Sequence, residues 1–252
     1  MITDKELHYE VKEGIGTITI NRPHAWNALN SAVRSGIRAS LDSFNNDEHA
    51  KVLIITASGN AAFSAGADLK EMSDQNLRIP PPDFIPDLTS HKPVIAAING
   101  VALGGGFFLA QQADLVIAAE NATFGITEAR HGRGAPWAAQ LPLLIPPRIA
   151  LELLLTAQPI SALRAKEAGL INFVVPPEQL TDASREMAQQ IASNAPLSVA
   201  AGKAMIALIL AEILGDTRQR VDDIWESVYL SEDAQEGPRA FKEKRPPRWQ
   251  GR

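Results

Sequence analysis

The sequence predicts an α/β protein whose C-terminal part is mainly helical. Short runs of branched apolar residues, typical of strands buried on both faces, recur through the first half of the chain. Turns and helical segments separate these runs in a strand, turn, helix, strand rhythm, which is typical of the α/β class. From about residue 137 onward, helical periodicity dominates instead. The 252 residues are 45% hydrophobic, which is enough for one large core.

The first half of the chain contains most of the predicted strands. Residues 7–20 alternate apolar and polar around two glycines, which predicts a β-hairpin. A helix over 32–45 follows, with Asn30 or Ser31 as its N-cap. Further along, we expect buried strands at 51–57, 93–99 and 114–120, a helix from near Asp68, a proline-rich loop over 79–88, and a helix that ends near Gln112.

The second half is predicted to be helical with one strand. The residues "INFVV" at 171–175 form that strand. Helices are expected at 147–156, 161–169, 177–193, 197–214 and 217–230.

The composition argues against several classes of function. The net charge of −5 gives no reason to expect a nucleic acid or an anionic membrane as partner. The absence of cysteine excludes disulfides, thiolate zinc sites and a cysteine nucleophile. No paired histidines stand at metal spacing, and no phosphate loop or nucleophile elbow is present, so no metal or separate cofactor is expected. The polar N-terminus and the expectation that no apolar run reaches membrane-spanning length favour a cytoplasmic protein.

Three consecutive glycines in "GVALGGGFFLAQQ" stand at the predicted start of a buried helix. The first N–H groups of a helix have no partner inside it, and bare backbone lets a ligand oxygen reach them. Close packing against a neighbouring strand would explain the glycines equally well. A second stretch of small residues, "FSAGADLKEM" at 63–72, precedes another helix, for which Asp68 is a candidate N-cap.

Both stretches follow buried strands of the predicted sheet. Loops at the C-terminal ends of strands in an open α/β sheet tend to gather at one site. Two backbone N–H groups brought together in this way would form an oxyanion hole. Ser64 lies near the proposed hole, but no histidine is positioned to activate it.

These two stretches, together with "HKPVIAAINGVALGGGFFLAQQADLVIAAENATFG", resemble the enoyl-CoA hydratase/isomerase (crotonase) family. The resemblance runs nearly end to end and includes "NRPHAWNALN", "LLLTAQPISALRAKEAGLINFVVP" and "AFKEKRPPRW". It implies a spiral of repeated strand–strand–helix units over 1–195, which holds the site for a coenzyme A thioester. It further implies a C-terminal helical region over 196–252 that completes this site and builds homotrimers, often paired into hexamers.

The resemblance also implies a reaction class. In this family an acyl-CoA thioester oxygen sits in an oxyanion hole where an enolate-like intermediate is held, and the coenzyme A is part of the substrate. The backbone N–H groups of Ala65 and Gly105 match the two donors. The implied substrate-binding residues are Ala25, Ala67, Asp68, Leu69, Phe108 and Lys244. The resemblance also implies contacts with the coenzyme A for His24, beside Ala25, and for Arg245, beside Lys244. An ordinary solvated basic tail would equally explain Lys244 and Arg245.

The chain departs from the hydratases of the family at one of two expected glutamates. Hydratases use two glutamates to position and activate water, and the first lies three residues beyond the oxyanion glycine. Phe108 occupies that position here. The second glutamate matches Glu128 in "FGITEARHGRG". A carboxylate beside an aromatic ring is poorly solvated, so we expect the pKa of Glu128 to be raised toward a value useful for proton transfer.

One remaining carboxylate favours double-bond isomerisation over hydration. Family members that move a double bond from the 3,4 to the 2,3 position have one glutamate at the position of Glu128, and one base can return the proton that it removed. Two alternatives stay open: hydration despite Phe108, and an acyl-CoA-binding protein without activity. A pure binder has no need of Glu128, which speaks against the second.

Other residues are further candidates for a part in the chemistry. His131 would share a helical face with Glu128, although a lone histidine is more often structural. Arg130 or Arg133 could pair with Glu128 and keep it ionised. Trp137 either lines the pocket or packs the next helix, and packing is favoured. Glu71 and Asp83 lie where the family shapes its acyl pocket, although surface carboxylates explain them better.

Overall fold

The computed structural model describes residues 2–3, 5–74, 84–215 and 217–252. Its strands are β1 (Ile2–Thr3), β2 (Leu7–Lys12), β3 (Ile15–Ile20), β4 (Val52–Ala57), β5 (Ala62–Ser64), β6 (Val94–Ile98), β7 (Val101–Leu103), β8 (Leu115–Ala119), β9 (Thr123–Gly125), β10 (Ile160–Ser161) and β11 (Phe173–Val175). Its α-helices are α1 (Ser31–Asn46), α2 (Leu69–Asp74), α3 (Gly105–Gln112), α4 (Leu141–Leu144), α5 (Pro147–Thr156), α6 (Ala162–Glu167), α7 (Leu180–Ala192), α8 (Pro196–Leu214), α9 (Thr217–Leu230) and α10 (Asp233–Lys242). Four 3₁₀ turns, η1 (Pro23–Ala25), η2 (Glu128–His131), η3 (Pro136–Gln140) and η4 (Pro177–Gln179), complete the described elements.

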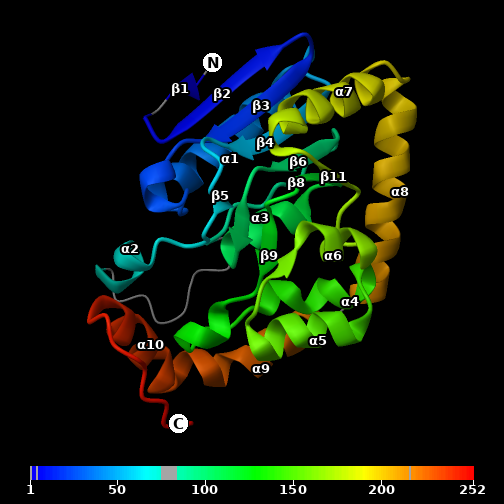
Figure 1. Cartoon of the computed structure of the whole chain (residues 1–252). Helices are drawn as coiled ribbons and strands as arrows, with labels where there is room; N and C mark the ends of the chain where they lie inside the picture. The colour runs from blue at the N-terminus through cyan, green and yellow to red at the C-terminus, as the bar shows by residue number, and fades with distance from the viewer. Residues whose placement is uncertain (1, 4, 75–83, 216) are drawn as a thin grey trace.

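A seven-stranded sheet forms the centre of the molecule, in the order β1-β2-β3-β4-β6-β8-β11 (Figure 1). The first three strands are antiparallel, and every pairing from β3 onward is parallel. In β4 and β6 nearly every residue is buried, because both faces of a parallel sheet are covered. Ile15, Ile54 and Ile95 pack under α7 on one face, and α1 and α3 cover the other face.

A second sheet of short strands, in the order β10-β9-β7-β5, lies beside the first. Each of β5, β7 and β9 directly follows a long strand of the first sheet, and each leads into a helix or a 3₁₀ turn. The chain thus repeats a strand–strand–helix unit as β4-β5-α2, β6-β7-α3 and β8-β9-η2. This confirms the α/β class and the crotonase-type spiral that the resemblance implies. Because β5, β7 and β9 pair in parallel, the segments that follow them emerge at the same edge.

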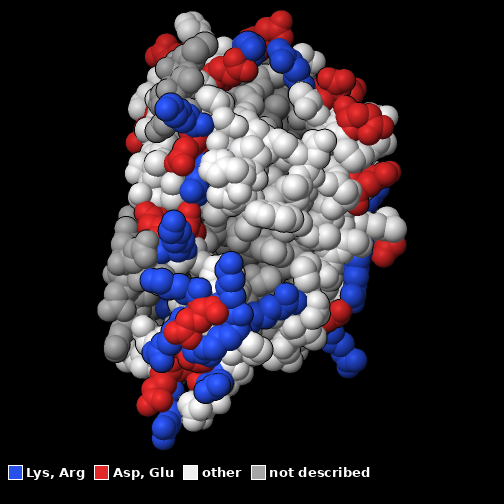
Figure 2. All heavy atoms as spheres, turned by 60° about the vertical axis from the view of Figure 1, so that its left-hand side comes forward, with Lys and Arg blue, Asp and Glu red and all other residues white. Residues whose placement is uncertain are grey.

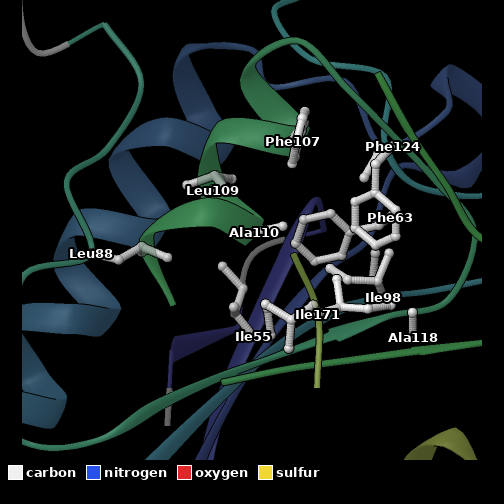
Figure 3. Close-up of a cluster of buried hydrophobic side chains, with 14 of the residues drawn as sticks. Ile55, Phe63, Leu88, Ile98, Phe107, Leu109, Ala110, Ala118, Phe124 and Ile171 are labelled. Carbon is white, nitrogen blue, oxygen red and sulfur yellow. The ribbon is translucent and has the colours of Figure 1, made fainter. Parts of the chain in front are cut away.

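Aromatic side chains pack between α3 and the strands. Figure 3 shows Phe63, Phe107 and Phe124 close together above Ile98 and Ala118. The rings of Phe107 and Phe124 meet edge to face, with centroids 5.7 Å apart. Because Phe107 is only 1% exposed, α3 is fixed to the core directly behind the three glycines.

The last helices leave the core and return to it. In Figure 1, α8 runs along the edge of the molecule, α9 crosses below it, and α10 lies beside α2. Helix α8 presents its apolar side chains to solvent, and by length and composition it could cross a membrane. The expectation that no apolar run reaches that length is therefore wrong. Lys203, in the middle of α8, nevertheless ties the helix to the sheet through Asp114, at 2.7 Å.

Candidate active site

The three glycines at the start of α3 each have a separate structural reason. Gly104 has a φ of 52° with ψ of −123°, a conformation open to glycine, and a β-carbon there would stand 3.3 Å from Oε1 of Glu128. A β-carbon on Gly106 would stand 2.3 Å from the carbonyl oxygen of Ser64. Close packing therefore explains Gly106. A β-carbon on Gly105 would stand 2.6 Å from Cδ1 of Ile85, and the N–H of Gly105, the first of the helix, has no acceptor within α3.

The loop after β5 lies against this helix start. A β-carbon on Gly66 would stand 3.0 Å from the backbone nitrogen of Gly105, so the two stretches of small residues meet, as predicted. Gly66 has a φ of 92°, which lets the chain turn there.

The prediction that Ala65 donates to a thioester oxygen is wrong. The Ala65 N–H already donates to the carbonyl oxygen of Trp26, at 3.0 Å. Ala67 stands two residues further on, in a parallel bridge with Leu29 in which the Leu29 N–H donates to Gly66 O at 2.8 Å. In such a bridge the flanking residues bond to the partner strand, so the N–H of Ala67 itself faces away from Leu29. Within the described part of the chain, no backbone acceptor engages it.

Glu128 lies at the start of η2, just after β9, and its carboxyl group is beside Gly104. Oε1 accepts a hydrogen bond of 3.1 Å from Nε1 of Trp137. Oε2 is buried and has no hydrogen-bond partner among the residues that the structure describes. Burial raises the pKa of Glu128 to about 7, although bonds from Trp137 and from nearby backbone oppose the rise.

Two phenylalanine rings pack on the tryptophan that bonds this carboxyl group. Phe108 stands one turn beyond Gly105 on α3, and its ring stacks on Trp137 with centroids 5.5 Å apart and an angle of 22°. Phe107 meets the edge of Trp137 at 5.6 Å. Packing against the next helix is the favoured sequence interpretation of Trp137, and no pattern in the sequence predicts that its indole N–H reaches Glu128.

Residues predicted to contact coenzyme A lie at the same end of the molecule as the glycines. Asp68 caps α2 by accepting from the N–H groups of Lys70 and Glu71, and Arg22 donates to it at 3.0 Å. Burial works to raise the pKa of Asp68, but the Arg22 hydrogen bond and the backbone bonds outweigh it, so the pKa is lowered. Leu69 begins α2, and Ala25 ends η1 one residue before Trp26. Their contacts with a substrate stay predictions.

The basic C-terminal segment is partly neutralised within the chain. Arg245 pairs with Glu236 through both terminal guanidinium nitrogens and with Glu243 through Nε. These bonds lower the pKa of Glu236 to about 2, chiefly through Arg245. Arg245 is therefore engaged within the chain, and the predicted substrate contacts of Lys244 and Arg245 both stay predictions. Figure 2 shows Lys and Arg mixed with Asp and Glu at the end that carries α10.

The other candidates have structural roles. The His131 ring meets Phe241 of α10 edge to face at 5.9 Å. Arg133 lies over the ring of Tyr229 at 5.4 Å. Glu71 accepts from the Ser31 N–H and from Arg34. Asp83 lies outside the described residues. No group of three metal-ligating side chains occurs in the described ranges. A hollow of about 70 Å³ lies on the opposite face of the sheet, between β3, β4 and α7.

Three comparisons place this arrangement among known proteins. The sequence matches the family model described as enoyl-CoA hydratase/isomerase over residues 10–252. Carnitinyl-CoA dehydratases from Salmonella paratyphi A and Salmonella typhi are each 40% identical to it, over 98% of this chain and 99% of theirs. A crystal structure of carnitinyl-CoA hydratase from Mycobacterium avium is 37% identical and covers 99% of this chain and 100% of its own, with a TM-score of 0.90. An enoyl-CoA hydratase structure from Mycobacterium tuberculosis H37Rv is 33% identical, with a TM-score of 0.82 over 90% of this chain and 100% of its own.

Proposed function

This chain belongs to the enoyl-CoA hydratase/isomerase family and is an acyl-CoA-processing enzyme, and we propose that it isomerises the double bond of a 3-enoyl-CoA with Glu128 as its single proton carrier. The observation that supports this most is the pairing of one buried carboxyl group at Glu128 with an aromatic ring at Phe108. Hydration in this family uses two carboxylates to hold and activate water. Proton transfer between two carbons needs one.

The oxyanion hole is assigned to the N–H groups of Ala67 and Gly105. The Ala67 N–H faces away from the Leu29 bridge, and Gly66 brings Ala67 next to the helix start of Gly105. The partial positive charge at the N-terminus of α3 adds to the pull on a developing oxyanion. Ala67 thus takes the role predicted for Ala65.

The proposed reaction is a 1,3-proton transfer. The C2–H bond of the 3-enoyl-CoA breaks, its proton moves to Oε2 of Glu128, and the electron pair delocalises onto the thioester oxygen as a dienolate. Ala67 and Gly105 stabilise that oxygen. The same proton then bonds to C4, and the double bond lies between C2 and C3. No water is added or lost, and Glu128 returns to its ionised form.

A carboxyl pKa of about 7 suits this role. At neutral pH comparable fractions of Glu128 are ionised and protonated, so the group accepts a proton and releases it with a small free-energy difference. A protein that only binds acyl-CoA gains nothing from a buried carboxyl group with a free oxygen. This supports an enzyme over a non-catalytic binder.

Hydration is the second candidate, because the relatives at 40% and 37% identity carry the names carnitinyl-CoA dehydratase and carnitinyl-CoA hydratase. For this chain, hydration would require Glu128 to activate water alone beside the rings of Phe108 and Trp137. Under either candidate, the coenzyme A arrives as part of the substrate and no metal or other cofactor is proposed. We keep the cytoplasm as the proposed location and the division at residue 195 as the proposed domain boundary.

Separate incubations with a 2-enoyl-CoA and a 3-enoyl-CoA test the proposal, with product masses measured by mass spectrometry. We expect the 3-enoyl substrate to give a 2-enoyl product of equal mass, and Glu128→Gln to lose this activity. Glu120→Gln, an exposed glutamate one residue after β8, is the matched control and should keep it. A mass gain of one water from the 2-enoyl substrate, without isomerisation of the other, would favour hydration.

A further inference from the structure

We propose that Trp137 is a positioning residue that fixes which oxygen of Glu128 moves the proton, and that Phe108 holds Trp137 in this role; the inference rests on the proposed proton transfer by Glu128. Phe108 would then act on Glu128 through Trp137, in addition to filling the position where hydratases of the family have a glutamate.

The two carboxyl oxygens of Glu128 differ in their hydrogen bonding. The indole N–H of Trp137 occupies Oε1 at 3.1 Å, whereas Oε2 is buried without a partner in the described part of the chain. A carboxylate attached to a flexible side chain can exchange its two oxygens by rotation. A fixed donor on one oxygen suppresses that exchange and leaves the other oxygen to react. A buried polar atom without a partner is uncommon, and a catalytic role explains it.

The indole is itself fixed by α3. Phe108 stacks on its ring, and Nε2 of Gln111 donates to the carbonyl oxygen of Trp137 at 3.3 Å. Phe108 and Gln111 are three residues apart, so they share one face of the helix. Phe107 closes the remaining edge of the indole. Helix α3 therefore both begins at the predicted oxyanion hole and sets the direction of the donor to Glu128.

The chemistry of an indole suits this role better than that of a second carboxylate. Indole donates a hydrogen bond but neither accepts one through nitrogen nor titrates, so it cannot take the proton in transit. A carboxylate in its place would repel ionised Glu128 and raise its pKa further. The stacked rings of Phe108 and Trp137 add apolar surface to the site, which disfavours water that would exchange the carried proton or attack the substrate.

Other titratable groups lie near Glu128, on α9 and on η2 with the residues that follow it. Tyr229 of α9 donates to Gly134 O, and burial, with Glu128 nearby among the smaller causes, raises its pKa to about 12. Arg133 lies over the ring of Tyr229, and burial lowers its pKa. On η2 itself, burial and Arg130 lower the pKa of His131. Trp137→Phe substitutes none of these groups, so a change in the titration of Glu128 in that variant is assigned to the lost indole bond.

The direct test is the titration of Glu128 in protein carrying ¹³C-labelled glutamate carboxyl groups, with the signal assigned by its loss in Glu128→Gln. In Trp137→Phe the ring remains and the donor is removed, so we expect the pKa of Glu128 to rise by about one pH unit. Trp249→Phe is the matched control, because that ring lies against Gly132 of the same loop. An unchanged titration in Trp137→Phe, with the protein folded, would overturn the inference.

Phe108 is tested through a pair of variants. Phe108→Leu keeps an apolar side chain but removes the stack, and we expect kcat to fall about tenfold or more with little change in KM. Phe108→Tyr restores a ring and should recover most of kcat. Equal activity in Phe108→Leu and the unaltered protein would show that Phe108 only lines the site and does not hold Trp137 in position.

These outcomes separate the inference from the proposed function. The titration needs no turnover, so a shifted pKa in Trp137→Phe supports the positioning bond even if the enzyme turns out to hydrate its substrate. If the unaltered protein does not isomerise a 3-enoyl-CoA, the proposed function is overturned. An unshifted titration beside intact isomerisation would overturn the inference alone.

Discussion

At the scale of single residues, Glu128 combines a destabilising position with a useful one. Its carboxyl group is buried, and one oxygen lacks a partner within the described residues. The ionised form is therefore disfavoured, and the pKa rises from the ordinary 4.5 to about 7. The same shift that brings the pKa near the working pH reduces the stability of the folded chain once the group is ionised.

The pH dependence of activity follows from the raised pKa. Glu128 must be ionised to remove the first proton, so kcat/KM should fall about tenfold for each pH unit below about 7 and level off above it. Initial rates with a 3-enoyl-CoA between pH 5 and 9 would show this limb. A profile that stays flat down to pH 5 would contradict a single base with this pKa.

The stability of the chain should also depend on pH through Glu128. Between pH 4.5 and 7 the folded chain keeps a proton that the unfolded chain loses, so the contribution is complete below 4.5 and is lost as pH rises through 7. Glu128→Gln removes this loss. At pH 8 we expect the free energy of unfolding of the variant to exceed that of the unaltered chain by about 3 kcal/mol. At pH 4.5 we expect the two free energies of unfolding to be nearly equal. Denaturant titrations at both pH values would measure the difference.

Residue roles could be predicted only as far as the sequence specifies local backbone. Glu128 and Gly105 lie in the motifs that carry the resemblance, and the structure brings their segments together. Ala65 and Ala67 are both small residues of one loop. Only the Trp26 carbonyl, 39 positions earlier in the chain, decides which N–H is already engaged. Such long-range pairing leaves no local signal.

At the scale of elements, the packing of α3 on β5 positions the site. Gly106 lets the helix backbone come within contact of Ser64, and Phe107 anchors the helix on the other side. The long buried strands and most helices were predictable from their apolar periodicity. The short strands β5, β7 and β9 were not, because three residues are too few to show a period. Helix α10 was missed for a different reason, because Pro238 stands inside it and its composition is polar.

Gly106→Ala should separate α3 from β5. The added β-carbon would meet backbone atoms of Ser64 at 2.3 Å, which cannot yield without moving a strand. We expect destabilisation of about 3 kcal/mol or more and a loss of activity that exceeds it. Gly36→Ala in α1 is the control, since its β-carbon meets only side-chain atoms of Leu7, at 3.3 Å. Similar melting temperatures and rates for the two variants would contradict this account of the glycine.

At the scale of the whole molecule, the C-terminal helices connect the site to an exposed apolar surface. Trp225 and Tyr229 of α9 pack on Gly134, six residues after Glu128, and α10 packs on η2. On α8 the apolar side chains at Leu197, Met205, Ile206, Leu208 and Ile213 are all more than half exposed. An apolar surface of this kind marks an interface with protein or membrane.

We expect α8 to join copies of this chain into a trimer or a pair of trimers. Light scattering after size-exclusion chromatography should give three or six times 27.2 kDa. Ile206→Asp combined with Leu208→Asp should reduce this mass, and Glu178→Lys, exposed before α7, should not. A monomer in the absence of detergent, or recovery of the protein with lipid vesicles, would contradict the expected assembly.

The central claim is that one buried carboxyl group carries a proton from one carbon of the substrate to another. The most direct measurement is isomerisation of an unlabelled 3-enoyl-CoA in deuterium oxide, with the deuterium content of the 2-enoyl product measured at early conversion. Because Oε2 of Glu128 is buried, the proton should return before it exchanges, and the product should contain well under one deuterium at C4. Incorporation of one full deuterium in every turnover, or the addition of deuterium oxide across the double bond, would contradict the claim.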